Sequence, residues 1–434
     1  MRITNGMVTN NILLSLNRNK FALSTYEQQL ATGKKIQKPS DDPIVAVRAL
    51  KFRSNVREVE QYKSNAKDAV SWMNITSNSI TNVLEIVKKV RGLCVQGSSD
   101  TFNVEQRKSM ISSLEQLKEQ LTNEGNVDYA GRHVFTGYKT DKPLTYTEGN
   151  NEKYKITQKF STDDMEKVKK IIDKGSDANP KIIEVDRIRL GYSQVKIEDI
   201  TFNSGGNPFD VDKKQSTDDG AYEPEVGKVY LLEDTGELIF NSADRDKVKD
   251  GFDFKYNKEG FKKGDLNPIH YYKCEDSNGT TYDNKRDSIN YQISYNQNIN
   301  VNTLGKDLIT IDLVRDLEEI IKEVSKVKND GSKHDDLLKD SLGDKFSSLI
   351  GKIDKHKNNL LHHEADLGTR INRLDLTINR LEDDKLNFTE LLAENENIDI
   401  AEVMVKMKAQ EMVYNGALMA SGKIVQATLL DFIR

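Results

Sequence analysis

The stretch FSSLIGKIDKHKNNLLHHEADLGTRINRLDLTINRLEDDKLNF (346–388) carries an apolar residue at every seventh position. The repeat never misses along the series Phe346, Ile353, Leu360, Leu367, Leu374, Leu381 and Phe388. A repeat of about 3.5 residues held this long keeps one seam of a helix facing a partner helix, which is the sequence condition for coiled-coil packing. The segment therefore predicts a helical rod of roughly 65–70 Å.

A second seam of the same kind lies near the other end of the chain. Between Ala49 and Val87, most positions at alternating steps of three and four residues are apolar. We therefore predict an elongated helical hairpin built from both chain ends. Its predicted rod core consists of Phe52, Val56, Val59, Val70, Met73, Ile80 and Leu84 on one side, and of Phe346, Ile353, Leu360, Leu367, Leu374 and Leu381 on the other.

Helix-capping signals flank both seams. We expect a first helix from Asn10 to Thr32 that ends at Gly33. In the corner KIQKPSDDP (35–43) we expect Ser40 and Asp41 to cap the next helix, with Pro43 in its first turn. Near the other end, the spacing of Asp399 and Glu402 predicts the start of the last helix.

The composition excludes several classes of protein. The chain of 434 residues has 64 basic and 69 acidic side chains, and this near balance argues against a nucleic acid partner. No apolar run is long enough for membrane insertion. The opening MRITNGMVTNNILLSL lacks the apolar region of a cleaved signal peptide. The two cysteines, Cys94 and Cys274, lie in different predicted domains, and we expect no disulfide between them.

The middle of the chain has a different character. Twelve of the 16 tyrosines fall between Tyr138 and Tyr295, and KVYLLEDTGELIF (228–240) predicts a β-hairpin. KIIEVDRIRL (181–190) and SINYQISYNQNINVNT (288–303) also alternate as strands do. A short helix is expected from Asp163 to Lys174. The predicted fold class is thus α + β, with a β-rich domain inserted into the helical hairpin.

Candidate catalytic residues are lacking. The chain contains no glycine-rich phosphate loop, nucleophile elbow or HExxH motif. His356 and His363 are seven residues apart and could bridge a metal with Glu364, but solvated side chains flanking Leu360 are the simpler interpretation. We expect no enzyme activity, cofactor or metal.

At both ends the chain resembles the flagellin family. ATGKKIQKPSDDPIVA (31–46) resembles the segment that follows the first helix in flagellins. The KPSDDP form, the MRIT opening and GRHVFTGYKTD (131–141) look more like the hook-associated (FlgL-type) branch at the hook–filament junction than like flagellin itself. The stretch from LGTRINRL (367–374) to the closing LLDFIR (429–434) resembles the C-terminal domain shared by both.

This resemblance implies a structural subunit of the bacterial flagellum. Such proteins leave the cell through the flagellar type III export channel without a cleaved signal, and become extracellular. The implied partners are a cytosolic export chaperone at the C-terminal region, a FlgK-type junction protein, flagellin, and further copies of the chain in a homo-oligomer. Flagellin itself, a flagellin-like protein with an enzymatic insertion and an unrelated coiled-coil adhesin or sensor remain the alternatives.

Five regions follow from these patterns. They are a terminal assembly segment with the first helix (1–42), two halves of the rod (43–140 and 305–397), the β-rich insertion (141–304) and a terminal assembly helix (398–434). Terminal helices with an apolar seam and no partner are marginal in water, so neighbouring copies would order them. The predicted assembly interface consists of Ile3, Val8, Ile12, Leu16, Leu418, Val425, Leu429 and Phe432.

Overall fold

The structure is a computed structural model that describes residues 5–98, 104–172, 181–202, 209–248, 251–326 and 333–430. The chain forms two compact units. The first unit comprises Met1–Ala66, Ile293–Tyr295 and Leu376–Arg434. The second comprises Lys67–Gln292 and Asn296–Asp375. Two long helices, α2 (Pro43–Gly97) and α7 (Lys333–Glu396), contribute residues to both units.

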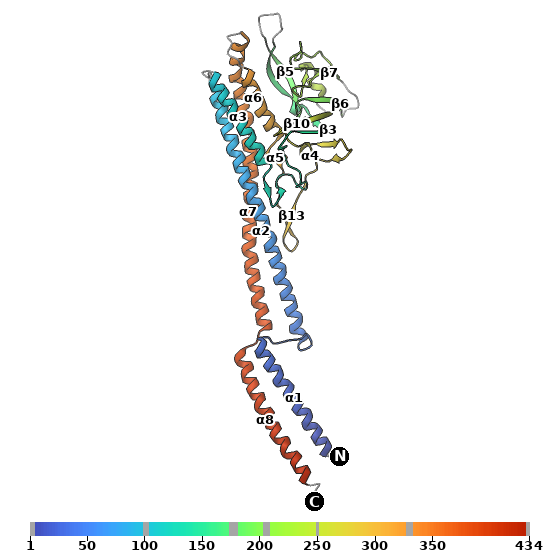
Figure 1. The fold of residues 1–434 in the computed structure, drawn as a ribbon, viewed down its shortest axis with the longest axis vertical. Coiled ribbons are helices and arrows are strands. Elements are labelled where there is room, and N and C mark those ends of the chain that lie inside the picture. The colour runs from blue at the N-terminus through green and yellow to red at the C-terminus, as the bar shows by residue number, and fades with distance from the viewer. Residues whose placement is uncertain are drawn as a thin grey trace. The chain divides into compact units, whose positions relative to one another are not determined.

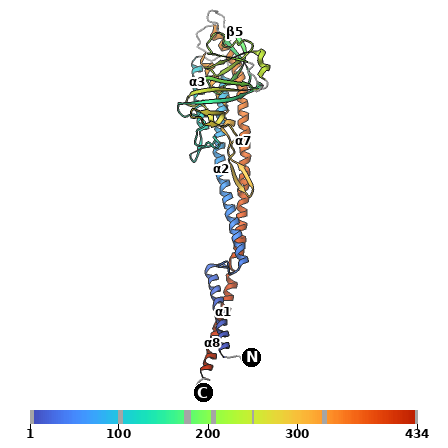
Figure 2. The same cartoon turned by 90° about the vertical axis from the view of Figure 1, so that its right-hand side faces the viewer.

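Helices from both chain ends make up the first unit. Helix α1 (Asn5–Thr32) packs on α8 (Ile400–Leu430), and the two lie side by side in both views (Figure 1, Figure 2). The first part of α2 pairs with the last part of α7 through ion pairs of Lys63 with Glu382 and of Lys385 with Glu60. From the first ion pair to the second, the residue number falls on α2, from 63 to 60, and rises on α7, from 382 to 385. The two helices are therefore antiparallel.

The second unit contains the rest of these two helices. The Arg91 guanidinium donates to both carboxylate oxygens of Asp354, at 2.9 and 3.2 Å. The Thr81 hydroxyl donates to the Glu364 carboxylate at 3.1 Å. Helices α3 (Val104–Gly125) and α6 (Ile311–Lys326) pack on each other in the same unit, and α6 buries one apolar side of amphipathic spacing.

Two five-stranded sheets form the β-rich part of the second unit. One has the order β12-β11-β3-β10-β6, and all its neighbours are antiparallel. Its strands are β3 (Asn150–Phe160), β6 (Val195–Phe202), β10 (Phe252–Phe261), β11 (Lys273–Asp276) and β12 (Thr281–Tyr282). Alternate side chains of β10, including Phe252, Phe254 and Tyr256, are fully buried, which fits a half-buried antiparallel strand.

The other sheet has the order β4-β5-β9-β8-β7, in which only the pair β7–β8 is parallel. Its strands are β4 (Glu166–Ile172), β5 (Lys181–Arg189), β7 (Asp210–Lys214), β8 (Lys228–Leu232) and β9 (Glu237–Phe240). One side packs around an apolar cluster of Val185, Ala221, Tyr230, Leu232 and Ile239. The same side also carries a network of buried charges, since Arg187 is the register partner of Ile239 and Glu237 that of Leu232.

Short elements connect these layers. They are β1 (Asp128–Tyr129), β2 (Arg132–His133), η1 (Thr162–Asp164), η2 (Ser242–Val248), α4 (Pro268–Tyr271), α5 (Gly305–Leu308) and the two-stranded sheet of β13 (Asn290–Ser294) and β14 (Gln297–Asn300). None of the described helices combines the length and the apolar content of a membrane span.

The predicted fold class is confirmed: helices from the two chain ends pack together, and the sheets lie in the middle of the sequence. The predicted hairpin at 228–240 is formed by β8 and β9, and 181–190 is a strand. The helix predicted from Asp163 to Lys174 is wrong, because Glu166–Ile172 form strand β4 and pair with β5. Met165, Val168, Ile171 and Ile172 fit a helical period over so short a window, and strand pairing decided the outcome.

The corner before α2 also differs from its prediction by one residue. Ser40 and Asp41 do not cap this helix. Instead, the Asp42 carboxylate accepts the backbone N–H groups of Ile44 and Val45, at 3.0 and 3.1 Å. The predicted cap of the last helix is present, because Asp399 accepts the N–H groups of Ala401 and Glu402. The spacing of Asn103 and Gln106 in the sequence also predicts a helix cap, but Asn103 lies outside the described residues.

Candidate assembly surface on the terminal helices

The two connections that lead into the terminal helices are tied to each other. The N–H of Lys35 donates to the carbonyl of Glu396 at 2.7 Å, and the N–H of Ile398 donates to the carbonyl of Gly33 at 3.1 Å. Gly33 has a φ of 72°, a left-handed conformation that glycine adopts at little cost and that ends α1. The Glu396 carboxylate also pairs with Lys34 and Arg53. This clasp, the set of contacts between 33–35 and 396–398, fixes the end of α1 relative to the start of α8.

Beyond the clasp, α1 and α8 share a seam of their own. Half-buried positions recur along α1 at steps of four and three, in the series Ile12, Leu16, Asn19, Leu23, Tyr26 and Leu30. The matching series on α8 is Val403, Met407, Gln410, Tyr414, Ala417 and Ser421. The Gln410 amide donates to the Asn19 side chain at 3.1 Å. A polar pair within an apolar seam selects one register of the two helices.

A further apolar series lies on the open side of each terminal helix. On α1 it consists of Met7, Leu14 and Phe21, which are 57–75% exposed and seven residues apart. On α8 it consists of Val405, Met412 and Met419, which are 70–73% exposed and also seven residues apart. We call these six residues the open series. Because water makes large exposed apolar side chains unfavourable, a regularly spaced set of this kind indicates an interaction surface.

The first parts of the long helices extend this exposed apolar character. Within the first unit, Ile44 and Val47 of α2 and Leu386 of α7 each expose about two-thirds of their area. The same unit has a pocket of about 280 Å³, lined by the corner 36–39, by Ala46, Ala49 and Leu50 of α2, and by Glu396. The first unit therefore offers both apolar ridges and a recess.

The predicted interface residues lie in three different settings. Val8, Ile12 and Leu16 are half-buried, and the last two belong to the seam shared with α8. Leu418 is exposed, close to the open series. The side chains of Ile3, Val425, Leu429 and Phe432 lie outside the described residues. The structure also gives the terminal helices a partner within their own chain, which the sequence did not lead us to expect.

The residues predicted for the rod core can be placed unit by unit. In the first unit, Val59 and Leu381 are buried, whereas Phe52 and Val56 are half-buried. In the second unit, Val70 is half-buried, and the following are buried: Met73, Ile80, Leu84, Phe346, Ile353, Leu360, Leu367 and Leu374. Two charged residues of α7 have partners on α2: Glu364 accepts from Thr81, and Lys385 pairs with Glu60.

The histidines of the rod are engaged with protein groups. The His356 ring lies 3.1 Å from the Asp316 carboxylate and 3.4 Å from the Thr310 hydroxyl. The His362 and His363 rings lie 5.8 Å apart. Within the described residues, no group of histidine, cysteine and carboxylate side chains is arranged to hold a metal ion. Cys94 and Cys274 are both free and buried.

Comparison with known proteins identifies the N-terminal part of the chain. Residues 3–140 match the family described as the bacterial flagellin N-terminal helical region. This part of the chain is a flagellin N-terminal helical region. The match contains α1, the corner before α2, all of α2 and all of α3.

Two curated relatives represent two branches of the flagellin family. Flagellar hook-associated protein 3 of Escherichia coli K12 is 27% identical over 142 residues, which is 32% of this chain and 45% of the relative. Flagellin of Salmonella montevideo is 27% identical over 237 residues, which is 53% of this chain and 44% of the relative. The chain thus spans less than half the length of the curated relatives it matches.

Among solved structures, the chain is similar to the flagellar junction protein FlgL of Legionella pneumophila. The two have 12% sequence identity and a TM-score of 0.37, over 82% of this chain and all of the other. A TM-score this low leaves the family assignment to the sequence matches.

The hydrogen bonds of the corner 35–43 explain why it needs two successive aspartates. The Asp41 carboxylate accepts the N–H groups of Gln37 and Lys38, at 3.0 and 2.9 Å, and these hydrogen bonds lower the Asp41 pKa. Asp42 then caps α2, and Pro43 occupies its first position. Two successive carboxylates thus fold the corner and start the helix.

Sequence reasoning missed the open series. Its signal was available, because Met7, Leu14 and Phe21 already repeat at intervals of seven in the sequence. The open series alternates along α1 with the apolar residues of the seam that faces α8. A single sequence does not show which of these two apolar sides of α1 packs on α8. The clasp was missed for a different reason, since backbone hydrogen bonds between distant connections leave no residue pattern.

Proposed function

We propose that this chain is a structural subunit of the bacterial flagellum that forms the junction between hook and filament. Its role in this proposal is structural rather than enzymatic. The observation that carries the proposal is the open series: a chain with a flagellin N-terminal helical region presents apolar residues at heptad spacing on both terminal helices. The match to flagellar hook-associated protein 3 supports the junction rather than another site in the flagellum.

The proposed mechanism is helix packing between copies. The internal seam of α1 and α8 uses one side of each helix, and the open series leaves a second side available. A helix with two apolar stripes can take part in a bundle of more than two helices. Burial of six large apolar side chains would contribute on the order of 1.5–3 kcal/mol each, before the cost of association. Neighbouring copies, a FlgK-type junction protein and flagellin are the proposed partners.

Delivery to this site requires export. We propose that the chain leaves the cytoplasm through the flagellar export channel, without cleavage of a signal, and functions outside the cell. A cytosolic chaperone that covers the C-terminal region would keep the apolar face of α8 from aggregating before export.

The second candidate is flagellin, the bulk subunit of the filament. The longer alignment with flagellin of Salmonella montevideo favours it. The two candidates differ in a simple property, since a filament subunit polymerises without limit. Purified protein that grows long filaments from seeds would favour flagellin, whereas short or absent polymers would favour the junction protein.

Electron microscopy of a deletion strain tests the proposed function. We expect cells that carry hooks without filaments and release flagellin into the medium, and a plasmid copy of the gene should restore filaments. Hooks with filaments of normal length and number would contradict the proposal.

A further inference from the structure

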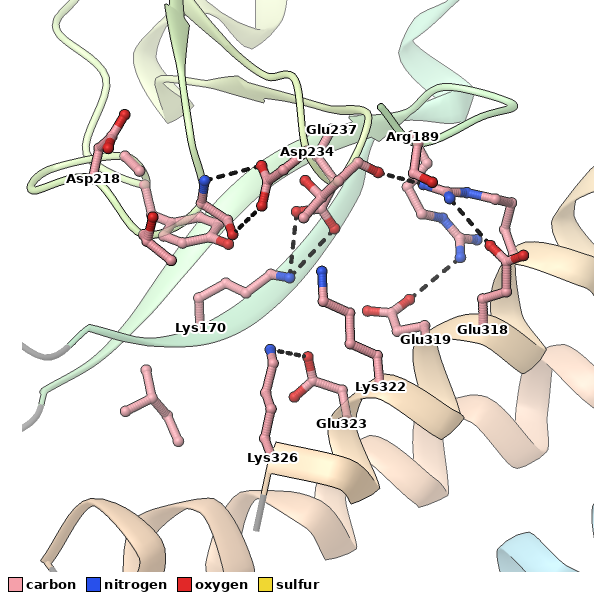
Figure 3. Close-up of a pocket in the computed structure, with 18 of the residues that line it drawn as sticks. Lys170, Arg189, Asp218, Asp234, Glu237, Glu318, Glu319, Lys322, Glu323 and Lys326 are labelled. Carbon is pink, nitrogen blue, oxygen red and sulfur yellow. Dashed lines mark hydrogen bonds and ion pairs between the residues drawn. The ribbon is translucent and has the colours of Figure 1, made fainter. Parts of the chain in front are cut away.

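A large cavity of the second unit lies between a sheet and a helix. Its volume is about 610 Å³, within the range of sites that bind small molecules. The walls are β4, β5 and β9 of one sheet, the loop 216–222 and one side of α6, together with Lys345 of α7 (Figure 3). Charged side chains line it on both walls, so the sheet does not close on α6 through apolar packing here.

The carboxylates of this cavity are mostly committed to donors of the protein. Glu237 accepts from Arg187 at 2.6 Å and from Lys170 at 3.3 Å. Glu319 accepts from Arg187 at 2.7 Å, and Glu318 accepts from Lys118 at 2.7 Å. Asp234 accepts from the backbone and hydroxyl of Ser216.

Two lining aspartates complete the set of carboxylates. Asp218 accepts from the backbone N–H of Gln215 at 2.7 Å. Asp219 is exposed. It is the one lining carboxylate of the described residues for which no hydrogen bond or ion pair is found.

The ammonium groups are in excess at one end of the cavity. Lys326 and Lys345 share a single carboxylate, that of Glu323. Lys170 shares Glu237 with the Arg187 guanidinium. For Lys322, no carboxylate of the described residues lies within ion-pair distance. In Figure 3 the Lys322 side chain extends into the cavity, with its ammonium near that of Lys170. The ion-pair partners of these four ammonium groups are therefore two carboxylates, Glu237 and Glu323, and the Asp234 carboxylate acts on Lys322 from beyond ion-pair distance.

The protonation equilibria reflect this crowding. Burial and the neighbouring Lys326 ammonium lower the pKa of Lys322. Burial also lowers the pKa of Lys345, and the Glu323 carboxylate only partly offsets it. An additional negative charge at this end would therefore be stabilising.

Two buried donors without partners and an aromatic ring also belong to the lining. The Nε of Arg315 and the hydroxyl of Thr235 are buried without a hydrogen-bond partner among the described residues. Both residues line the cavity, and a buried donor without a partner is destabilising. The ring of Tyr222 lies under the Lys170 ammonium, 5.5 Å from it. A ligand with acceptor oxygens could satisfy the two donors.

We infer that this cavity binds a small molecule carrying a phosphate or sulfate group, whose oxygens accept from Lys322, Lys326 and Lys170. A tetrahedral oxyanion suits this arrangement because it offers acceptors in several directions to separate ammonium groups, whereas a carboxylate is matched best by one planar guanidinium. The site is independent of the terminal helices and of their proposed assembly, because all its residues belong to the second unit.

The test measures binding to the full-length protein, with inorganic phosphate and pyrophosphate as probes. Isothermal titration calorimetry is run at constant ionic strength, balanced with sodium chloride, and thermal melting is followed in parallel. We expect saturable binding at millimolar or lower concentrations and a rise in the melting temperature that chloride does not give. Lys322→Ala should weaken binding at least tenfold, and Lys322→Arg should retain most of it.

A matched variant separates a site from a general effect of charge. Lys355→Ala removes the same charge from α7, at an exposed position outside the cavity lining. It should bind like the unaltered protein. Circular dichroism checks that each variant is folded, and Lys322→Gln replaces Lys322→Ala if the latter is not. Binding no stronger than that of chloride, or equal loss in Lys322→Ala and Lys355→Ala, would overturn the inference.

Discussion

The Arg187 guanidinium donates to the Glu237 carboxylate at 2.6 Å, and the two side chains are only 1% and 8% exposed. Arg187 also pairs with Glu319 of α6 at 2.7 Å. A neighbouring pair, Arg189 with Asp316 at 2.8 Å, joins the same sheet to the same helix. The sheet β4-β5-β9-β8-β7 is therefore held on α6 by buried charges.

Loss of Arg187 should be costly. In Arg187→Met, Glu237 and Glu319 would keep their burial and lose their main partner, so we expect the free energy of unfolding to fall by about 3–5 kcal/mol. Urea denaturation followed by circular dichroism measures this. The control is Arg286→Met, because Arg286 is exposed and pairs with Asp307 at the surface; this change should cost at most about 1 kcal/mol. Similar costs for the two variants would contradict the importance of burial.

The same network predicts a loss of stability in acid. Burial opposes the charge of Glu237, but Lys170 and Arg187 outweigh it and lower its pKa to about 2. Lys326 and Lys345 likewise lower the pKa of the buried Glu323 to about 2. An unfolded glutamate has a pKa of about 4.3. Stability from these groups is therefore complete above about pH 5 and is lost as the pH falls toward 2.

Urea midpoints measured from pH 7 to pH 2.5 check this prediction. We expect a plateau down to about pH 5 and a steady decrease below pH 4.5. Glu237→Gln should make the decrease shallower, because the titrating group is gone. A midpoint that stays constant down to pH 3 would count against the network.

The seam of the long helices can be tested at one position. Leu374 is fully buried, and Leu374→Asp would place an unpaired charge in the seam. We expect a loss of several kcal/mol, on the order of 3–5, in the free energy of unfolding. Leu376 is 72% exposed on the same helix, so Leu376→Asp should change stability by only about 0.5 kcal/mol. If both variants melt alike, the assignment of Leu374 to a core is wrong.

The two thiols should be unreactive in the folded protein. Burial raises the pKa of Cys94 and of Cys274 to about 12, and both side chains are almost inaccessible. We expect a thiol reagent at pH 8 to label neither cysteine within minutes, and both after unfolding in urea. Mass spectrometry counts the labels. Rapid labelling of the native protein would show that α2 or β11 opens readily.

The sequence predicts the fold well where one pattern dominates. The seven-residue repeat of α7 predicts a helix over its whole length, because so long a helical period does not fit a strand. The hairpin of β8 and β9 follows from its turn residues. Glu166–Ile172 were misread because seven residues fit both a helical and a strand period, and only pairing with β5 decides between them.

The candidate surface could be predicted only in part. Ile12 and Leu16 are apolar and regularly spaced, and so are Leu14 and Phe21, so the sequence marks both sides of α1. Which side faces α8 depends on the clasp at Gly33 and Glu396, formed by chain segments more than 350 residues apart. The cavity with Lys322 was not predicted either, since its lysines come from a strand, α6 and α7.

The central claim is that the open series holds the subunit in the flagellum. The most direct measurement is the incorporation of Phe21→Asp into flagella of a strain that lacks the native copy. Phe21 is 75% exposed, so the variant should melt like the unaltered protein. Asn17→Asp, at an exposed polar position of α1, adds the same charge as a control. We expect Phe21→Asp to be exported and yet absent from purified flagella, with filaments lost, while Asn17→Asp assembles normally. Flagella that contain Phe21→Asp in normal amounts and carry normal filaments would contradict the account.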